Sequence, residues 1–137
     1  MTILSFAAMY LLMYIMINKY ADFYPSLSQV YMAGSMTAAM IIIELIVMGS
    51  MYKNALVRNV LIGTGAVTLI LFIAFTRYQT AIYDADFLRS MIPHHSGAIL
   101  MCENPKLEDP AIKSLCRSII ESQQSEIDQM KAIMQRK

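Results

Sequence analysis

Three long apolar runs fill the first half of the chain. They cover residues 3–20, 30–52 and 57–76, and few charged residues fall before Arg77: Lys19, Asp22, Glu44, Lys53 and Arg58. An α-helix rises about 1.5 Å per residue, so about 20 apolar residues cross the roughly 30 Å hydrocarbon core of a bilayer. The pattern therefore predicts three membrane-spanning helices. The first run has no basic start and no small-residue cleavage site, which favours a retained anchor over a signal peptide.

The rest of the chain is polar and has helical periodicity. No glycine or proline occurs between Tyr78 and Ile92, so we expect the third span to leave the membrane as one long helix, kinked at Pro93. Asn104 and Pro105 should stop it. Asp109-Pro110 is a helix start, with an acid at the N-cap and a proline in the first turn. It predicts a last helix from Pro110 to about Met134, with a stripe of apolar residues at helical spacing: Ile112, Leu115, Ile119, Ile127, Met130 and Met134.

These elements predict an all-α integral membrane protein with two domains, a transmembrane domain over 1–77 and a water-facing helical hairpin over 78–137. The composition agrees, because 57% of the 137 residues are hydrophobic and only 15% are charged, which is too apolar for an ordinary soluble domain. The net charge of +1 gives no reason to expect a nucleic-acid partner. A hairpin of about 60 residues buries little core alone, so it should lean on the membrane part or on a second copy.

The positive charges of the loops indicate an orientation. With three spans, the second loop, which carries Lys53 and Arg58, lies opposite the polar domain. The positive-inside rule then places that domain outside; in a bacterium this means the inner (cytoplasmic) membrane, with the domain in the periplasm. In such an oxidising compartment Cys102 and Cys116 could form a disulfide. The alternative is two buried thiols, and spacing alone does not decide between them.

A cluster of soft metal ligands occurs in the hairpin. On a helix, Met91, His94 and His95 are three and four residues apart and share a face that continues to Met101. Thioether and imidazole groups suit copper-like ions. If Cys102 is level with Cys116, the opposite helix brings Gln123, Glu126 and Met130 to this face, where Gln123 or Glu126 could hold a second ring nitrogen of a ligating histidine. The alternative is structural, because methionines at this spacing also fill cores.

The expected spans carry a second group of candidates. Met32, Met36 and Met40 lie four residues apart, and together with Glu44, the only acid of the spans, they could form a membrane path for a soft cation. Lipid-facing or packing methionines and a hydrogen-bonded neutral acid are the alternative. The chain has no H-E-x-x-H, no Glu-x-x-His pair and no glycine-rich phosphate loop outside a span. We therefore expect a binding protein and not an enzyme.

The stretch from Phe87 to Met101, with Met91-x-x-His94-His95 at its centre, followed by Gln123-Gln124-x-Glu126-Ile127-x-x-Met130, resembles the family called domain of unknown function 305. The resemblance covers about 84–135, and the three spans resemble a membrane-anchored subgroup. It implies a ferritin-like bundle, usually exported, with some members binding copper in the periplasm through His and Met. The ligands implied are Met91, His94, His95, Met101 and Met130, supported by Gln123 and Glu126. One hairpin is half a bundle, so a homodimer or larger homo-oligomer should complete it.

These observations predict a membrane-anchored protein that binds a soft metal ion, most plausibly Cu(I), through its His/Met face, for metal tolerance or hand-over. An alternative is a metal-free membrane module for oligomerisation or interaction. A third is metal transport through the methionine-bearing spans.

Overall fold

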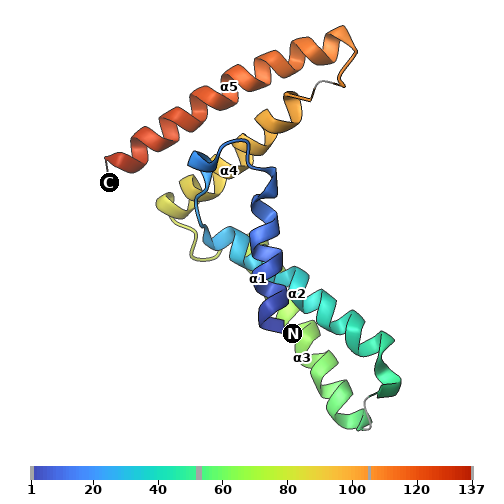
Figure 1. The fold of residues 1–137 in the computed structure, drawn as a ribbon. Coiled ribbons are helices and arrows are strands. Elements are labelled where there is room, and N and C mark those ends of the chain that lie inside the picture. The colour runs from blue at the N-terminus through green and yellow to red at the C-terminus, as the bar shows by residue number, and fades with distance from the viewer. Residues whose placement is uncertain (1, 52–53, 105, 137) are drawn as a thin grey trace. The chain divides into compact units, whose positions relative to one another are not determined.

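The computed structural model describes residues 2–51, 54–104 and 106–136 (Figure 1). All regular elements of this part are helical, which confirms the all-α class. The helices are α1 (Thr2–Leu12), α2 (Leu27–Val47), α3 (Ala55–Tyr78), α4 (Asp84–Cys102) and α5 (Pro110–Gln135), with 3₁₀ turns η1 (Met13–Met16), η2 (Tyr20–Asp22) and η3 (Gly49–Met51). The expected end of the second span at Tyr52, the loop residue Lys53 and the helix stop Pro105 lie outside the described residues.

The chain forms two units that differ from the expected domains in one segment. Unit 1 comprises Met1–Met13 and Ser28–Ala81, and unit 2 comprises Tyr14–Leu27 and Ile82–Lys137. The chain passes from unit 1 to unit 2 between Ala81 and Ile82, close to the expected domain boundary at 77. The segment 14–27, which we expected to be the end of the first span and a loop, belongs instead with the C-terminal hairpin. It does so because it carries Asp22, whose partners lie on α4 and α5.

The first apolar run does not form a full span, so the prediction of three spanning helices is wrong in number. Within the described part of the chain, only α2 and α3 are long and apolar enough to cross a membrane. The apolar helix Thr2–Met16 would be about 22 Å long at about 1.5 Å per residue, short of the roughly 30 Å hydrocarbon core. Its α-helical part ends at Leu12. From Tyr14 onward the chain belongs to unit 2, where the Tyr14 hydroxyl donates to the Tyr24 carbonyl (3.1 Å).

Unit 1 is built around the antiparallel hairpin of α2 and α3. Close packing occurs at Gly34, where an added Cβ would lie 2.8 Å from the Phe72 ring. The Tyr31 ring is tilted against that of Phe75, with 5.6 Å between ring centroids, and its hydroxyl donates to the Thr80 carbonyl (2.9 Å). α3 buries none of its residues within the protein. Its exposed apolar side chains include Leu56, Val60 and Ile70.

The expected long helix is broken between α3 and α4. α3 ends at Tyr78, and Gln79 (φ 51°) and Ala81 (φ 58°) both take up the left-handed backbone region. The backbone N–H groups of Gln79 and Thr80 donate to the Phe75 carbonyl, which satisfies the end of α3. Asp84 and Asp86 then lie in the first turn of α4, where acidic side chains favour a helix start. The prediction of one continuous helix is wrong because this break uses no glycine or proline.

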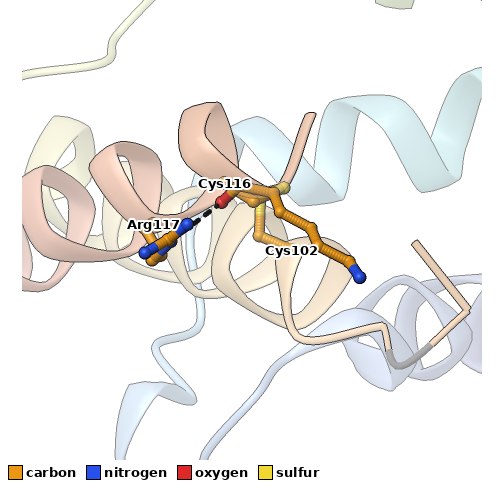
Figure 2. The surroundings of a disulfide bond; sticks show 4 residues. Cys102, Cys116 and Arg117 are labelled. Atoms are coloured by element: carbon orange, nitrogen blue, oxygen red, sulfur yellow. Dashed lines mark hydrogen bonds between the residues drawn. A yellow bond between two sulfur atoms is a disulfide. The ribbon is translucent and has the colours of Figure 1, made fainter. Parts of the chain in front are cut away.

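Unit 2 is the antiparallel hairpin of α4 and α5 with the segment 14–27 against it. A disulfide joins Cys102 to Cys116 near the turn, with 5.0 Å between the Cα atoms (Figure 2). Beside it, the Arg117 Nε donates to the Lys113 carbonyl (3.4 Å). α4 continues through Pro93. The core of the hairpin comprises Leu88, Ile92, Ile99, Ile127 and Met130.

The last helix begins as the sequence predicts. The Asp109 carboxylate accepts hydrogen bonds from the backbone N–H groups of Ala111 (2.7 Å) and Ile112 (3.4 Å), and Pro110 is in the first turn. The predicted apolar stripe is buried only in the C-terminal half of α5, at Ile127 and Met130. Ile112 and Leu115 are exposed, at 46% and 60%.

Candidate functional site

His95 is the polar centre of the α4–α5 hairpin. It lies on the inner face of α4 and is 7% exposed. Its Nδ1 is 2.9 Å from the Met91 carbonyl oxygen one turn earlier, and its Nε2 is 2.7 Å from the Glu126 Oε2 on α5. A carbonyl oxygen only accepts, so Nδ1 carries a proton and donates it. This bond fixes the orientation of the ring and directs Nε2 towards α5.

The pair of Nε2 and the Glu126 carboxylate requires a positive charge or a proton between them. With Nδ1 protonated, the Nε2 of a neutral ring is an acceptor, and an ionised carboxylate is also an acceptor. Two acceptors at 2.7 Å repel one another unless they share a proton. A proton between Nε2 and the carboxylate, or a cation in its place, satisfies both groups.

Two methionines lie one turn away from this pair. Met91 precedes His95 by four residues on α4, and Met130 follows Glu126 by four residues on α5. Because the helices are antiparallel and His95 is level with Glu126, Met91 is level with Met130. Met130 is 9% exposed within the core, and Met91 packs against that core. Two thioethers and one imidazole nitrogen are thus gathered on the inner face of the hairpin.

The other predicted ligands lie apart from this group. His94 is exposed, although its ring centroid is 5.9 Å from that of His95. Met101 is 63% exposed and lies about 15 Å along the helix from Met91, at about 1.5 Å per residue. One ion cannot reach both. Among the described residues, no group of three or more His, Cys, Asp or Glu side chains is arranged to hold a metal ion, so a metal here needs the methionines.

Gln123 and Glu126 differ in their contacts with His95. Only Glu126 is bonded to the ring. The Gln123 side-chain oxygen is buried and has no hydrogen-bond partner among the described residues. Of the two side chains expected to support the histidine, Glu126 is thus the one bonded to it.

A buried polar network that the sequence did not predict lies on the residue after His95. The Ser96 hydroxyl donates to Asp22 Oδ2 (2.8 Å) and accepts from the Asn18 backbone N–H (3.0 Å). Asp22 is 3% exposed, and its Oδ1 accepts from the Lys131 ammonium on α5 (2.5 Å). At Gly97 an added Cβ would lie 3.4 Å from the Met16 carbonyl. The small residues Ser96 and Gly97 thus let the segment 14–27 approach α4 and link it to α5.

The membrane path expected over Met32, Met36, Met40 and Glu44 stays a prediction. Met32 and Met36 line a cavity of about 200 Å³ together with Arg77. Glu44 lines a different cavity of about 690 Å³, and neither Met32, Met36 nor Met40 is among its lining residues. The methionines and the acid therefore do not share one lining.

Comparison with known proteins agrees with the helical hairpin. The profile of the family described as "Domain of unknown function (DUF305)" matches residues 72–134, a range that includes Met91, both histidines, Glu126 and Met130. The chain is also 38% identical, over 98% of its length, to "Uncharacterized protein L153" of Acanthamoeba polyphaga mimivirus, 88% of which is covered. No solved structure matches. The relative is aligned across both units, and the profile covers most of unit 2. The chain therefore belongs to the domain of unknown function 305 family.

Proposed function

We propose that the protein is a membrane-anchored binding protein for Cu(I), held by His95 Nε2 and the thioethers of Met91 and Met130. The observation that carries the proposal is the state of the His95 ring. Its Nδ1–H is committed to the Met91 carbonyl while its Nε2 faces the Glu126 carboxylate at 2.7 Å. Histidines that bind metals commonly donate the other ring N–H to a backbone carbonyl in this way, which fixes the tautomer and aims the ligating nitrogen.

The donor set fits a soft ion. A cation that replaces the shared proton satisfies both the ring nitrogen and the carboxylate. The side chain of Glu126 is 48% exposed, so it can also turn to solvent when an ion binds. Thioether sulfur and imidazole nitrogen favour Cu(I) over the hard ions that prefer oxygen. The two cysteines are joined in the disulfide, which leaves the methionines as the sulfur donors.

The membrane part of the proposal rests on α2 and α3. Both are long and apolar enough to cross a bilayer, and no residue of α3 is fully buried within the protein. A hairpin of two crossings returns the chain to the side from which it came. Both segments of unit 2 then share one side, as their packing requires. The disulfide supports an oxidising compartment, and Arg58 in the first turn of α3 favours the opposite, inner side for the end of the hairpin.

The copper proposal is tested with the full-length protein in detergent, by anaerobic competition for Cu(I) against a chelator of known affinity. The Met91→Leu/Met130→Leu variant removes both thioethers at nearly constant volume and should lose affinity by more than about tenfold. The matched control Met101→Leu changes an exposed methionine on the same helix and should bind as the wild type does. Equal affinity in all three proteins would overturn the proposal.

A second function is favoured by the same residues. Both ring nitrogens of His95 have protein partners, and Met130 lies in the core cluster with Ile127. The hairpin then serves as a metal-free module, and its exposed apolar side chains, which include Phe87 and Leu115, pack against a second copy. This alternative predicts that the double Met→Leu variant keeps both its oligomeric mass, measured by light scattering, and its function.

A further inference from the structure

A cavity within unit 1 contains a carboxyl group. It has a volume of about 690 Å³ and is lined by side chains of α1, α2 and α3. Most of the lining is apolar, and includes Phe6, Ile41 and Phe72. Glu44 is its only ionisable residue. A volume of roughly 300–1,000 Å³ with few polar groups is typical of sites for small organic ligands.

Besides Thr2, the polar side chains that line this cavity present hydrogen-bond acceptors to it. The hydroxyls of the lining residues Thr37, Thr64 and Thr68 donate to the carbonyls one turn earlier in their own helices, at 2.8, 2.9 and 2.9 Å. Each hydroxyl has one proton, so what remains is oxygen lone pairs. An ionised Glu44 is also acceptor-only. No lysine, arginine or histidine is among the lining residues.

We propose that this cavity binds an amphiphilic ammonium ion, that is, a protonated amine carried on an apolar body. The ammonium group supplies the positive charge and the N–H donors that Glu44 and the threonine oxygens lack, and the apolar body fills the rest of the space. This site is separate from the copper site, since it uses none of its residues. The proposal has one link with the membrane placement proposed above: the ligand enters the cavity from the lipid.

Other ligand classes match the lining less well. A hard inorganic cation such as Ca²⁺ takes six to eight oxygen ligands, and the side chains of the lining offer one carboxylate and four hydroxyls. A soft ion needs sulfur or nitrogen donors, which are absent from this lining. An anionic amphiphile is repelled by Glu44. A neutral amphiphile uses the apolar walls but gains nothing from the carboxylate.

The proposal is tested by the binding of 1-naphthylmethylamine to the full-length protein in nanodiscs of neutral phosphatidylcholine. Naphthyl fluorescence is read, and the signal of empty nanodiscs is subtracted. The neutral analogue 1-naphthalenemethanol has the same ring system without the charge. Glu44→Gln preserves the shape of the side chain and should weaken amine binding by at least about tenfold. It should leave the alcohol unchanged. The matched control Glu103→Gln alters an exposed acid of unit 2 and should change neither.

Equal amine affinity in wild type and Glu44→Gln, or equal binding of amine and alcohol to the wild type, would overturn the proposal. If Glu44→Gln is not monodisperse, Thr68→Val decides, because it removes one acceptor oxygen at constant shape. A loss of amine affinity of about threefold or more supports the site, and unchanged affinity refutes it. Cu(I) affinity is measured on the same variants and should stay constant, so a failure of the copper site is distinguished from a failure of this one.

Discussion

At the residue scale, two buried polar side chains of unit 2 are satisfied in different ways. His95 has an acceptor at each ring nitrogen, so its second bond depends on a proton or a metal ion. Asp22 has a donor at each oxygen, Ser96 at one and Lys131 at the other, and needs nothing further. The first arrangement is suited to exchange of a cation, and the second is suited to holding the unit together.

The Asp22 contacts give a stability prediction. Asp22→Ala leaves the Ser96 hydroxyl and the partly buried Lys131 ammonium without their acceptor, so we expect a loss of about 2–4 kcal/mol in the stability of unit 2. Thermal unfolding in detergent, followed by circular dichroism, measures it. The exposed Glu121→Ala should stay within about 0.5 kcal/mol of the wild type. If Asp22→Ala and Glu121→Ala had the same melting temperature, the network would have no stabilising role.

The sequence predicted the candidate site better than this network. Met91 and His95 share a face through helix spacing alone, and placing Cys102 level with Cys116 brought Glu126 and Met130 to that face. The Asp22–Ser96 bond joins residues 74 positions apart, and no local pattern predicts such a pairing. The one local sign was Ser96-Gly97, a pair of small residues within a helix, which is typical of close approach by another segment.

At the element scale, helix ends that carry their own signals could be predicted and those set by tertiary contacts could not. Asp109-Pro110 starts α5 through a cap that depends only on adjacent residues. The end of the first helix depends on Tyr14 reaching Tyr24. The break after α3 places Gln79 and Ala81 at positive φ, a region that residues other than glycine rarely occupy. Only the acids Asp84 and Asp86 indicated a new helix start there.

The packing of α2 on α3 predicts opposite effects for two glycine substitutions. Gly34→Ala places a Cβ 2.8 Å from the Phe72 ring and should destabilise the hairpin by about 1–3 kcal/mol. Gly63→Ala meets nothing within 4 Å and should stabilise it by about 0.5–1 kcal/mol, because glycine is unfavourable inside helices. Melting temperatures in the same detergent compare the two. The packing described for Gly34 is contradicted if both substitutions shift the melting temperature upwards.

At the scale of the whole molecule, unit 1 and unit 2 are each interrupted in sequence by part of the other. Unit 1 and unit 2 each combine an N-terminal piece with a later one. The chain therefore leaves the polar unit after residue 27 and returns to it near residue 82. In the proposed membrane topology, α2 and α3 cross the bilayer between these two points.

The proposed topology predicts opposite labelling of two introduced cysteines. In a Cys102→Ser/Cys116→Ser background, Glu108→Cys lies in the turn of unit 2, and Leu56→Cys lies near the start of α3. With the protein expressed in bacterial cells, a membrane-impermeant maleimide should label the first in intact cells and the second only after permeabilisation. Labelling of both from one side would contradict a membrane-crossing hairpin.

The central claim is that copper is bound by His95 together with Met91 and Met130. X-ray absorption at the copper edge of the Cu(I)-loaded protein tests this most directly, because it identifies the atoms around the ion. The account predicts sulfur neighbours and one imidazole, with the imidazole signal lost in His95→Ala and kept in His94→Ala. An imidazole signal that persists in His95→Ala, or a shell without sulfur, would contradict it.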